Sequence, residues 1–159
     1  MKNILRIFTL CLILSSGASA SETCPQECQT RLINAYYAGI NKIMMAESTI
    51  GDIDGFMNSL HDDVQYIHAE YGADFNKEAW RAAFVRSWKK GRYDNPKEAV
   101  TTVTKIIHGH KFAAVEFISR HKNKDTGELV VRPARLAMFG FKDGAISHVR
   151  DYWYHSTKK

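Results

Sequence analysis

No internal repeat, low-complexity tract or linker interrupts this chain of 159 residues, so its length favours one domain of ordinary size. No run of basic residues is present either, and 22 Lys and Arg are interspersed with 17 Asp and Glu. This pattern argues against a nucleic-acid partner. The apolar run from Ile7 to Leu14 is too short to span a bilayer, so it does not predict a membrane helix.

The first twenty residues have the features of a secretory signal peptide. Lys2 and Arg6 give a basic start, the short apolar run follows, and Ala18-Ser19-Ala20 fits the small-residue cleavage rule. We therefore expect residues 1–20 to be removed and residues 21–159 to form a single periplasmic or secreted domain, with no membrane contact after cleavage. A retained N-terminal anchor is the alternative. The mature chain of 139 residues (159 minus 20) has a net charge of +3, from 20 basic and 17 acidic residues.

Cysteine is scarce, and only Cys24 and Cys28 remain after cleavage of the signal peptide. Export favours their oxidation to a disulfide, which would fix the start of the first helix because its loop is so small. Free thiols are the alternative. A metal site would need further Cys or His residues beside them, and none is present.

Helical spacing of apolar residues predicts three helices in the first part of the chain. The first covers about residues 25–48 and is broken by Gly51-Asp52, where Asp52 can cap a short second helix. A strand follows at Val64–Glu70. Asp74 or Asn76 then opens a third helix that Gly91 ends, with an apolar stripe made of Trp80, Ala83, Phe84, Ser87 and Trp88.

After Pro96 the apolar pattern changes to the alternation of strands. The predicted strands cover residues 99–107, 112–121, 128–142 and a last segment after the Asp143-Gly144 turn. Gly109-His110 is the expected two-residue turn of the first hairpin, with Gly109 at positive φ. Helices followed by an antiparallel meander predict an α+β fold, in which a curved sheet around helices leaves a ligand cavity between them.

Three segments and the order of elements resemble the NTF2-like superfamily, and within it the SnoaL-like and ketosteroid-isomerase-like proteins. The segments are Gly51–Phe56, Leu60–Val64 and Gly144–Trp153. The resemblance implies an α+β cone, with three N-terminal helices packed on a curved, mainly antiparallel sheet, and commonly a dimer. Because that superfamily holds isomerases, cyclases, dehydratases, binding proteins and association modules, the fold does not name a reaction.

The resemblance to ketosteroid isomerases also implies positions for catalytic residues. Counting from Asp62-Asp63, the general-base position is His68. The oxyanion-hole tyrosine falls at Met44, unless a helical insertion brings in Tyr36 or Tyr37. The oxyanion-hole acid falls at Leu136, and only the pocket tryptophan, Trp153, matches. This count predicts that ketosteroid isomerisation is absent, while a titratable group remains at the base position.

His68 and Asp151 are the candidate catalytic residues. His68 shares a strand face with Tyr66, and a neutral imidazole suits proton abstraction next to a carbonyl, or dehydration. Asp151 shares a face with Trp153, and a carboxylate beside Trp in a closed cavity would have a raised pKa. Asp151 would either orient His68 or act as the base. The alternatives are a purely structural His68 and an ion pair between Asp151 and Arg132.

Aromatic and apolar side chains near these two residues are the candidate ligand contacts. Trp80, Phe84 and Trp88 recur at helical spacing, which is more typical of a core, but Trp88 lies at the end of the stripe and could stand at the cavity mouth. The predicted binding residues are Tyr66, Trp88, Arg132, Met138, Val149 and Trp153. No cofactor is expected. His108 and His110 lack a carboxylate partner, so no metal is expected there.

The last two strands also predict a surface for self-association. Two rows of residues would form an aromatic patch on the outer sheet face: Ile146, His148, Arg150, Tyr152 and Tyr154, and beside them Arg135, Ala137, Phe139 and Phe141. Such a patch seldom stays exposed, so we expect a homodimer through the outer sheet face.

Three functions are compatible with these features. The first is an enzyme of cofactor-free proton transfer, of the isomerase, cyclase or dehydratase type. The second is an exported protein that binds a small apolar molecule without chemistry, and the third is a dimeric association module with a vestigial cavity. An open cavity with converging His68 and Asp151 favours the first, an open cavity without convergence the second, and a filled cavity the third.

Overall fold

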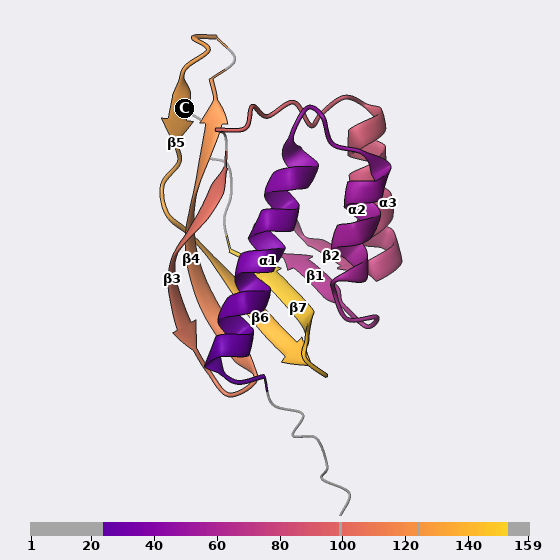
Figure 1. Cartoon of the computed structure of the whole chain (residues 1–159), viewed down its shortest axis with the longest axis vertical. Helices are drawn as coiled ribbons and strands as arrows, with labels where there is room; N and C mark the ends of the chain where they lie inside the picture. The colour runs from indigo at the N-terminus through magenta and orange to yellow at the C-terminus, as the bar shows by residue number, and fades with distance from the viewer. Residues whose placement is uncertain (1–23, 99, 124, 153–159) are drawn as a thin grey trace, which may run out of the picture.

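The computed structural model describes residues 24–98, 100–123 and 125–152, which form three α-helices, a short 3-10 helix and a seven-stranded sheet (Figure 1). The helices are α1 (Gln26–Met44), α2 (Ile50–Asn58), η1 (Ala69–Tyr71) and α3 (Lys77–Lys89). The strands are β1 (Gln65–His68), β2 (Ala73–Asn76), β3 (Thr101–His108), β4 (Phe112–Lys122), β5 (Leu129–Val131), β6 (Arg135–Lys142) and β7 (Ala145–Asp151). The predicted α+β class with three helices is confirmed.

The sheet has the order β2-β1-β7-β6-β4-β3, with β5 paired to β4 beyond this path. All neighbouring strands are antiparallel except β1 and β7, which are parallel. This pairing sets residues 65–68 beside residues 148–151, so Tyr66 is opposite Val149 and His68 is opposite Asp151. Two segments far apart in the sequence thus share one part of the sheet.

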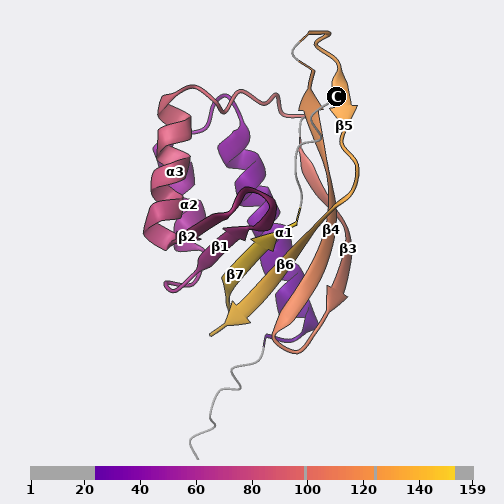
Figure 2. The same ribbon diagram turned by 180° about the vertical axis from the view of Figure 1, so that it is seen from behind.

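Helix α1 lies across one face of the sheet, and α2 and α3 lie beside each other at one side (Figures 1 and 2). The buried stripe of α1, which includes Ile33, Tyr36, Tyr37 and Ile43, has the spacing of an amphipathic helix. No described helix has the length and the apolar character needed to cross a membrane.

The break between the first two helices comes earlier in the structure than the predicted break at Gly51-Asp52. Helix α1 ends at Met44, and Thr49 caps α2 by accepting a hydrogen bond from the backbone N–H of Asp52. Asp52 is at N3, the third residue of α2, where it completes a capping box with Thr49, and Gly51 is helical. A hydrogen bond from the side chain of Lys42, followed by hydrogen bonds from the backbone and side chain of Thr49, lowers the pKa of Asp52 to about 2.

Two strands also differ from the expected pattern. Asn76, not Asp74, caps α3, and Asp74 belongs to β2, which the sequence did not predict. The expected strand 128–142 is two strands, β5 and β6, separated by a segment that contains Pro133. Proline cannot donate a ladder hydrogen bond, which accounts for the interruption.

The first hairpin turns one residue later than expected. The N–H of Gly109 donates to the carbonyl of Phe112, so His110 and Lys111 form the turn, and Gly109 has no positive φ. A Cβ at Gly109 would lie 2.6 Å from the carbonyl oxygen of Phe112, which explains the glycine. The second predicted turn is present: Asp143 and Gly144 both have positive φ, as a tight two-residue hairpin requires.

The predicted outer rows of the sheet are correct at Arg150 and Tyr152, which are exposed, and wrong along β6 and at Ile146, while Tyr154 lies outside the described residues. Ala137, Phe139 and Phe141 are buried, as is Ile146, whereas Leu136 and Met138 lie on the opposite face and are exposed. A bulge between Gly140 and Phe141 shifts the register, so Ile146 and Val149 both point into the core. The outer face instead carries an exposed patch, here called the outer patch, of Ile107, Phe112, Leu136, Met138 and Tyr152.

Candidate active site and ligand cavity

A cavity of about 420 Å³ lies between the helices and the sheet. Its apolar lining is mainly aromatic and comes from α1, β1, β2, α3 and β4: Tyr36, Tyr37, Tyr66, Phe75, Trp80, Phe84 and Phe117. These rings pack on one another, and Tyr66 stacks on Trp80 with ring centroids 4.5 Å apart. The volume lies within the range of small-molecule sites.

Asp151 is the carboxylate of this cavity among the described residues. It lies at the end of β7, only 9% exposed, and its Oδ2 accepts a hydrogen bond of 2.8 Å from the Tyr66 hydroxyl. Parallel pairing of β1 with β7 brings the two side chains to the same face of the sheet. A buried carboxylate held by a phenol on the wall of an aromatic cavity is a group that can accept protons.

The tyrosine hydroxyls around Asp151 stay protonated. Burial, followed by the negative charge of Asp151, raises the pKa of Tyr36, of Tyr37 and of Tyr66 well above the usual value. At neutral pH these three side chains are therefore hydrogen-bond donors. Counting back from Gly51 puts Met44 at the position of the oxyanion-hole tyrosine, but Gly51 lies inside α2 and does not mark the break between the helices. Tyr36 and Tyr37 both line the cavity, together with Met44.

The other candidate catalytic residue, His68, lies beside the cavity and not on its wall. It is 5% exposed, and its ring lies 4.4 Å from the ring of Tyr71 and 6.5 Å from that of Tyr66. In register it is the direct neighbour of Asp151. The structure thus brings His68 and Asp151 together in the sheet, while only Asp151 lines the cavity.

The predicted binding residues divide into two groups. Tyr66 and Arg132 line the cavity. Val149 is fully buried in the core, and Met138 is on the outer face, as is Leu136. The indole N–H of Trp88 donates to the carbonyl of Ser48 at 2.8 Å, and this side chain does not line the cavity either. Trp153 lies outside the described residues, as do residues 1–20.

Several basic side chains border the cavity, and among the arginines the sequence predicted only Arg132. Arg120, Arg132 and Arg135, here called the arginine cluster, line it together with His121. The Nε of Arg132 donates to Nδ1 of His121 at 3.1 Å. Burial and then the charges of Arg132 and Arg135 lower the pKa of His121. Pairing of Arg120 with Val131, the residue before Arg132, brings this group together.

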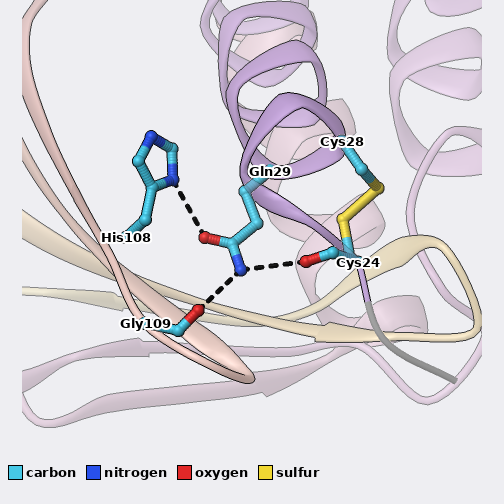
Figure 3. Close-up of a disulfide and its surroundings, with 5 residues drawn as sticks. All are labelled: Cys24, Cys28, Gln29, His108 and Gly109. Carbon is cyan, nitrogen blue, oxygen red and sulfur yellow. Dashed lines mark hydrogen bonds between the residues drawn. A yellow bond between two sulfur atoms is a disulfide. The ribbon is translucent and has the colours of Figure 1, made fainter.

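The start of α1 is fixed by a disulfide and a buried amide (Figure 3). Cys24 and Cys28 are bonded, and Gln29, 1% exposed, donates to the carbonyl oxygens of Cys24 and Gly109. Its Oε1 accepts from Nδ1 of His108 at 3.0 Å. No group of three or more His, Cys, Asp and Glu side chains in the described part of the chain is arranged to hold a metal ion.

No family model matches the sequence, and no curated protein matches it. Solved structures do match. A ketosteroid-isomerase-like fold protein from Catenulispora acidiphila, in complex with trimethylamine, has 14% identity and a TM-score of 0.56, covering 79% of this chain and 86% of its own. An NTF2-like protein of unknown function from Burkholderia pseudomallei has 14% identity and a TM-score of 0.56, covering 80% and 91%. The chain has the NTF2-like fold.

A third similar structure is a putative polyketide cyclase from Xanthomonas campestris pv. campestris, with 19% identity and a TM-score of 0.53. The match covers 80% of this chain and 91% of that protein. The resemblance seen in the sequence to NTF2-like proteins is therefore confirmed at the level of the fold. Identities this low carry the fold alone.

Proposed function

We propose that this chain is an exported binding protein of NTF2-like fold that holds a small, largely apolar molecule in the aromatic cavity. The observation that carries the proposal is the cavity itself, about 420 Å³ with aromatic walls and the Tyr66–Asp151 pair as a polar point. An open cavity argues against a vestigial one, because an association module would fill it with side chains. The ligand-bound Catenulispora structure supports a small-molecule role for this fold.

Filling the cavity tests this proposal. Ala83 lines it from α3, so Ala83→Phe places a ring in the space that the ligand needs. We expect mature wild-type protein to bind 2-naphthol in a calorimetric titration and Ala83→Phe to bind it about tenfold more weakly or worse, a change of about 1.4 kcal/mol. Ala35→Phe, at an exposed position of α1, is the control. Equal binding by both variants would place the ligand elsewhere and contradict the proposal.

A second function, proton transfer to and from a carbonyl compound, is favoured by the position of Asp151. The carboxylate would take a proton from the carbon next to the carbonyl, and the C–H electron pair would form the double bond of an enolate. The protonated hydroxyls of Tyr36 and Tyr37 would stabilise the enolate oxygen. Asp151 would then return the proton to carbon. Exchange of the α-protons of 2-tetralone for deuterium, followed by NMR, tests this step.

We assign the base role to Asp151 and a positioning role to His68. Asp151 lines the cavity, whereas His68 stands behind it as the register neighbour of Asp151. The putative polyketide cyclase among the similar structures supports a catalytic use of this fold, although its identity to this chain is only 19%. If binding is found without exchange, the chain is a binding protein only.

We also propose a homodimer through the outer patch. Five exposed apolar side chains lie close together across β3, β4, β6 and the residue after β7, because Ile107, Ala114 and Met138 are register neighbours. A patch of this kind is typical of an interface.

Leu136→Glu places a charge in the outer patch and is expected to convert the dimer to a monomer in sedimentation equilibrium. Leu129→Glu, an exposed apolar residue of β5, should leave the dimer intact. A wild-type monomer would contradict the proposal.

A further inference from the structure

We infer that two reciprocal ion pairs align the second copy of this chain on the outer patch, and that in each of them Glu116 of one subunit meets Arg150 of the partner subunit. This inference rests on the proposed homodimer and adds how the two copies are oriented. The two charges flank the patch on opposite sides. Glu116 is on β4 and Arg150 is on β7, and β6, which carries Leu136 and Met138, runs between these strands.

Strand register places both charged side chains on the outer face of the sheet. Glu116 is paired with Leu136, and Arg150 is paired with Met138. Residues directly opposite each other on neighbouring strands point to the same face. Because Leu136 and Met138 are exposed on the outer face, Glu116 and Arg150 lie there too, the first half-buried and the second exposed.

Neighbours within the subunit hold each of these side chains without neutralising its charge. The hydroxyl of Thr104 donates to Oε1 of Glu116 at 2.7 Å, and the guanidinium of Arg150 lies 5.4 Å from the ring centroid of Tyr152. Within the described part of the chain, neither Glu116 nor Arg150 forms an ion pair. This holds for Glu116 even though Lys105 is its register neighbour on β3. Each charge can therefore take a partner from outside the subunit.

The positions of the two charges are those that a twofold dimer requires. Glu116 and Arg150 are two strands apart, about 10 Å, and two residues apart along the strands, about 7 Å. Their midpoint therefore lies over β6, between Leu136 and Met138. When two sheets pack face to face, the twofold axis lies in the plane between them. An axis through this midpoint, at right angles to the line from Glu116 to Arg150, sets each charge opposite its counterpart.

This arrangement fits a second copy of the chain because one surface supplies both the anion and the cation. A twofold axis makes every contact twice, so the two ion pairs form together, on opposite sides of the axis. Leu136 and Met138 then lie near the centre of the interface. Charges that flank an apolar centre in this way fix the orientation of the two subunits and disfavour other alignments.

Reversal of one charge tests the pairing. In Arg150→Glu, Glu116 would face a glutamate of the partner subunit, and in Glu116→Arg, Arg150 would face an arginine. We expect the dimer of each variant to have a Kd at least about tenfold above that of the mature wild type in sedimentation equilibrium. The control is Arg31→Glu, a charge reversal at an exposed position of α1, which lies across the other face of the sheet. It should dimerise as the wild type does.

Restoration of the pairs distinguishes lost pairing from a damaged fold. The double variant Glu116→Arg/Arg150→Glu exchanges the two charges, so its dimer should have a Kd within about threefold of the wild-type value. An equimolar mixture of the two single variants should also form dimers. Each pair across the interface then joins a carboxylate to a guanidinium, although each single variant carries two like charges. A misfolded variant would not be rescued by mixing.

The pairing and the homodimer can fail separately. Dimerisation of Arg150→Glu and Glu116→Arg at wild-type strength would overturn the pairing and leave the homodimer to the test with Leu136→Glu. A mixture of monomeric single variants that stays monomeric would overturn the pairing as well. A monomeric wild type would contradict both, and the outer patch would then belong to another occupant, such as residues 153–159 or a different protein.

Discussion

Replacement of Asp151 by asparagine is expected to lower the rate of α-proton exchange in 2-tetralone by at least about 100-fold, the usual contribution of a general base. The substitution keeps the size of the side chain and leaves an oxygen that can accept the hydrogen bond of the Tyr66 hydroxyl. It removes the ability to take up a proton. Exchange is followed by NMR in D₂O, and ligand affinity by calorimetry.

Ligand affinity decides how the loss is interpreted. Because asparagine preserves shape, 2-tetralone should bind Asp151→Asn nearly as it binds the wild type, so the effect should be on the rate and not on the affinity. Asp94→Asn, at an exposed site outside the cavity, should exchange at the wild-type rate. Wild-type exchange by Asp151→Asn would remove the carboxylate from the mechanism.

Truncation of Phe139 to alanine should lower the free energy of unfolding by about 4 kcal/mol, as measured by urea denaturation. Its side chain is fully buried, and its ring lies 4.9 Å from that of Tyr36 and 5.9 Å from that of Tyr37. The substitution leaves a cavity behind the two tyrosines that line the ligand site. We therefore expect weaker binding of 2-naphthol as well, because the tyrosine wall loses its support.

The control for Phe139 is Leu129→Ala. Leu129 lies on β5 and is 44% exposed, so its truncation should change the unfolding free energy by less than about 1 kcal/mol. A loss at Phe139 no larger than this would show that the inner face of β6 is not packed as described. Unfolding curves with an unchanged slope are required for the comparison.

The helices and the NTF2-like fold could be predicted because their signals are local. Ile33, Tyr36 and Tyr37 lie on one face of α1 as their spacing required, and the Asp143-Gly144 turn has the residues that positive φ favours. The break before α2 was misplaced because Asp52 suits both a cap and the third position of a capping box. The capping box depends on Thr49, which the sequence did not single out.

Alternation holds along β6 and from His148 to Tyr152, but it does not say which face of β6 is buried, and it fails at Ile146. One bulge between Gly140 and Phe141 changes which residues point inward, so Ile146 is buried with Val149 although they are three positions apart. Arg132 was predicted at the cavity, but its neighbours Arg120 and Arg135 were not, for a related reason. Arg120 and Arg132 become neighbours only through the pairing of β4 with β5, which depends on the turn between them. Pro133 was the available signal that the long strand ends there.

The bonds of Gln29 have a consequence for the order in which the chain folds. Its amide joins α1 to residues 79 and 80 positions later, at the β3–β4 hairpin, whereas Cys24 and Cys28 are only four positions apart. Closing a long loop costs more entropy than closing a short one, and long-range contacts form late. The disulfide can therefore form while the rest of the chain is still unfolded. The contact of Gln29 with His108 and Gly109 is made only when the hairpin has docked against the helix, which joins the first and the later parts of the domain.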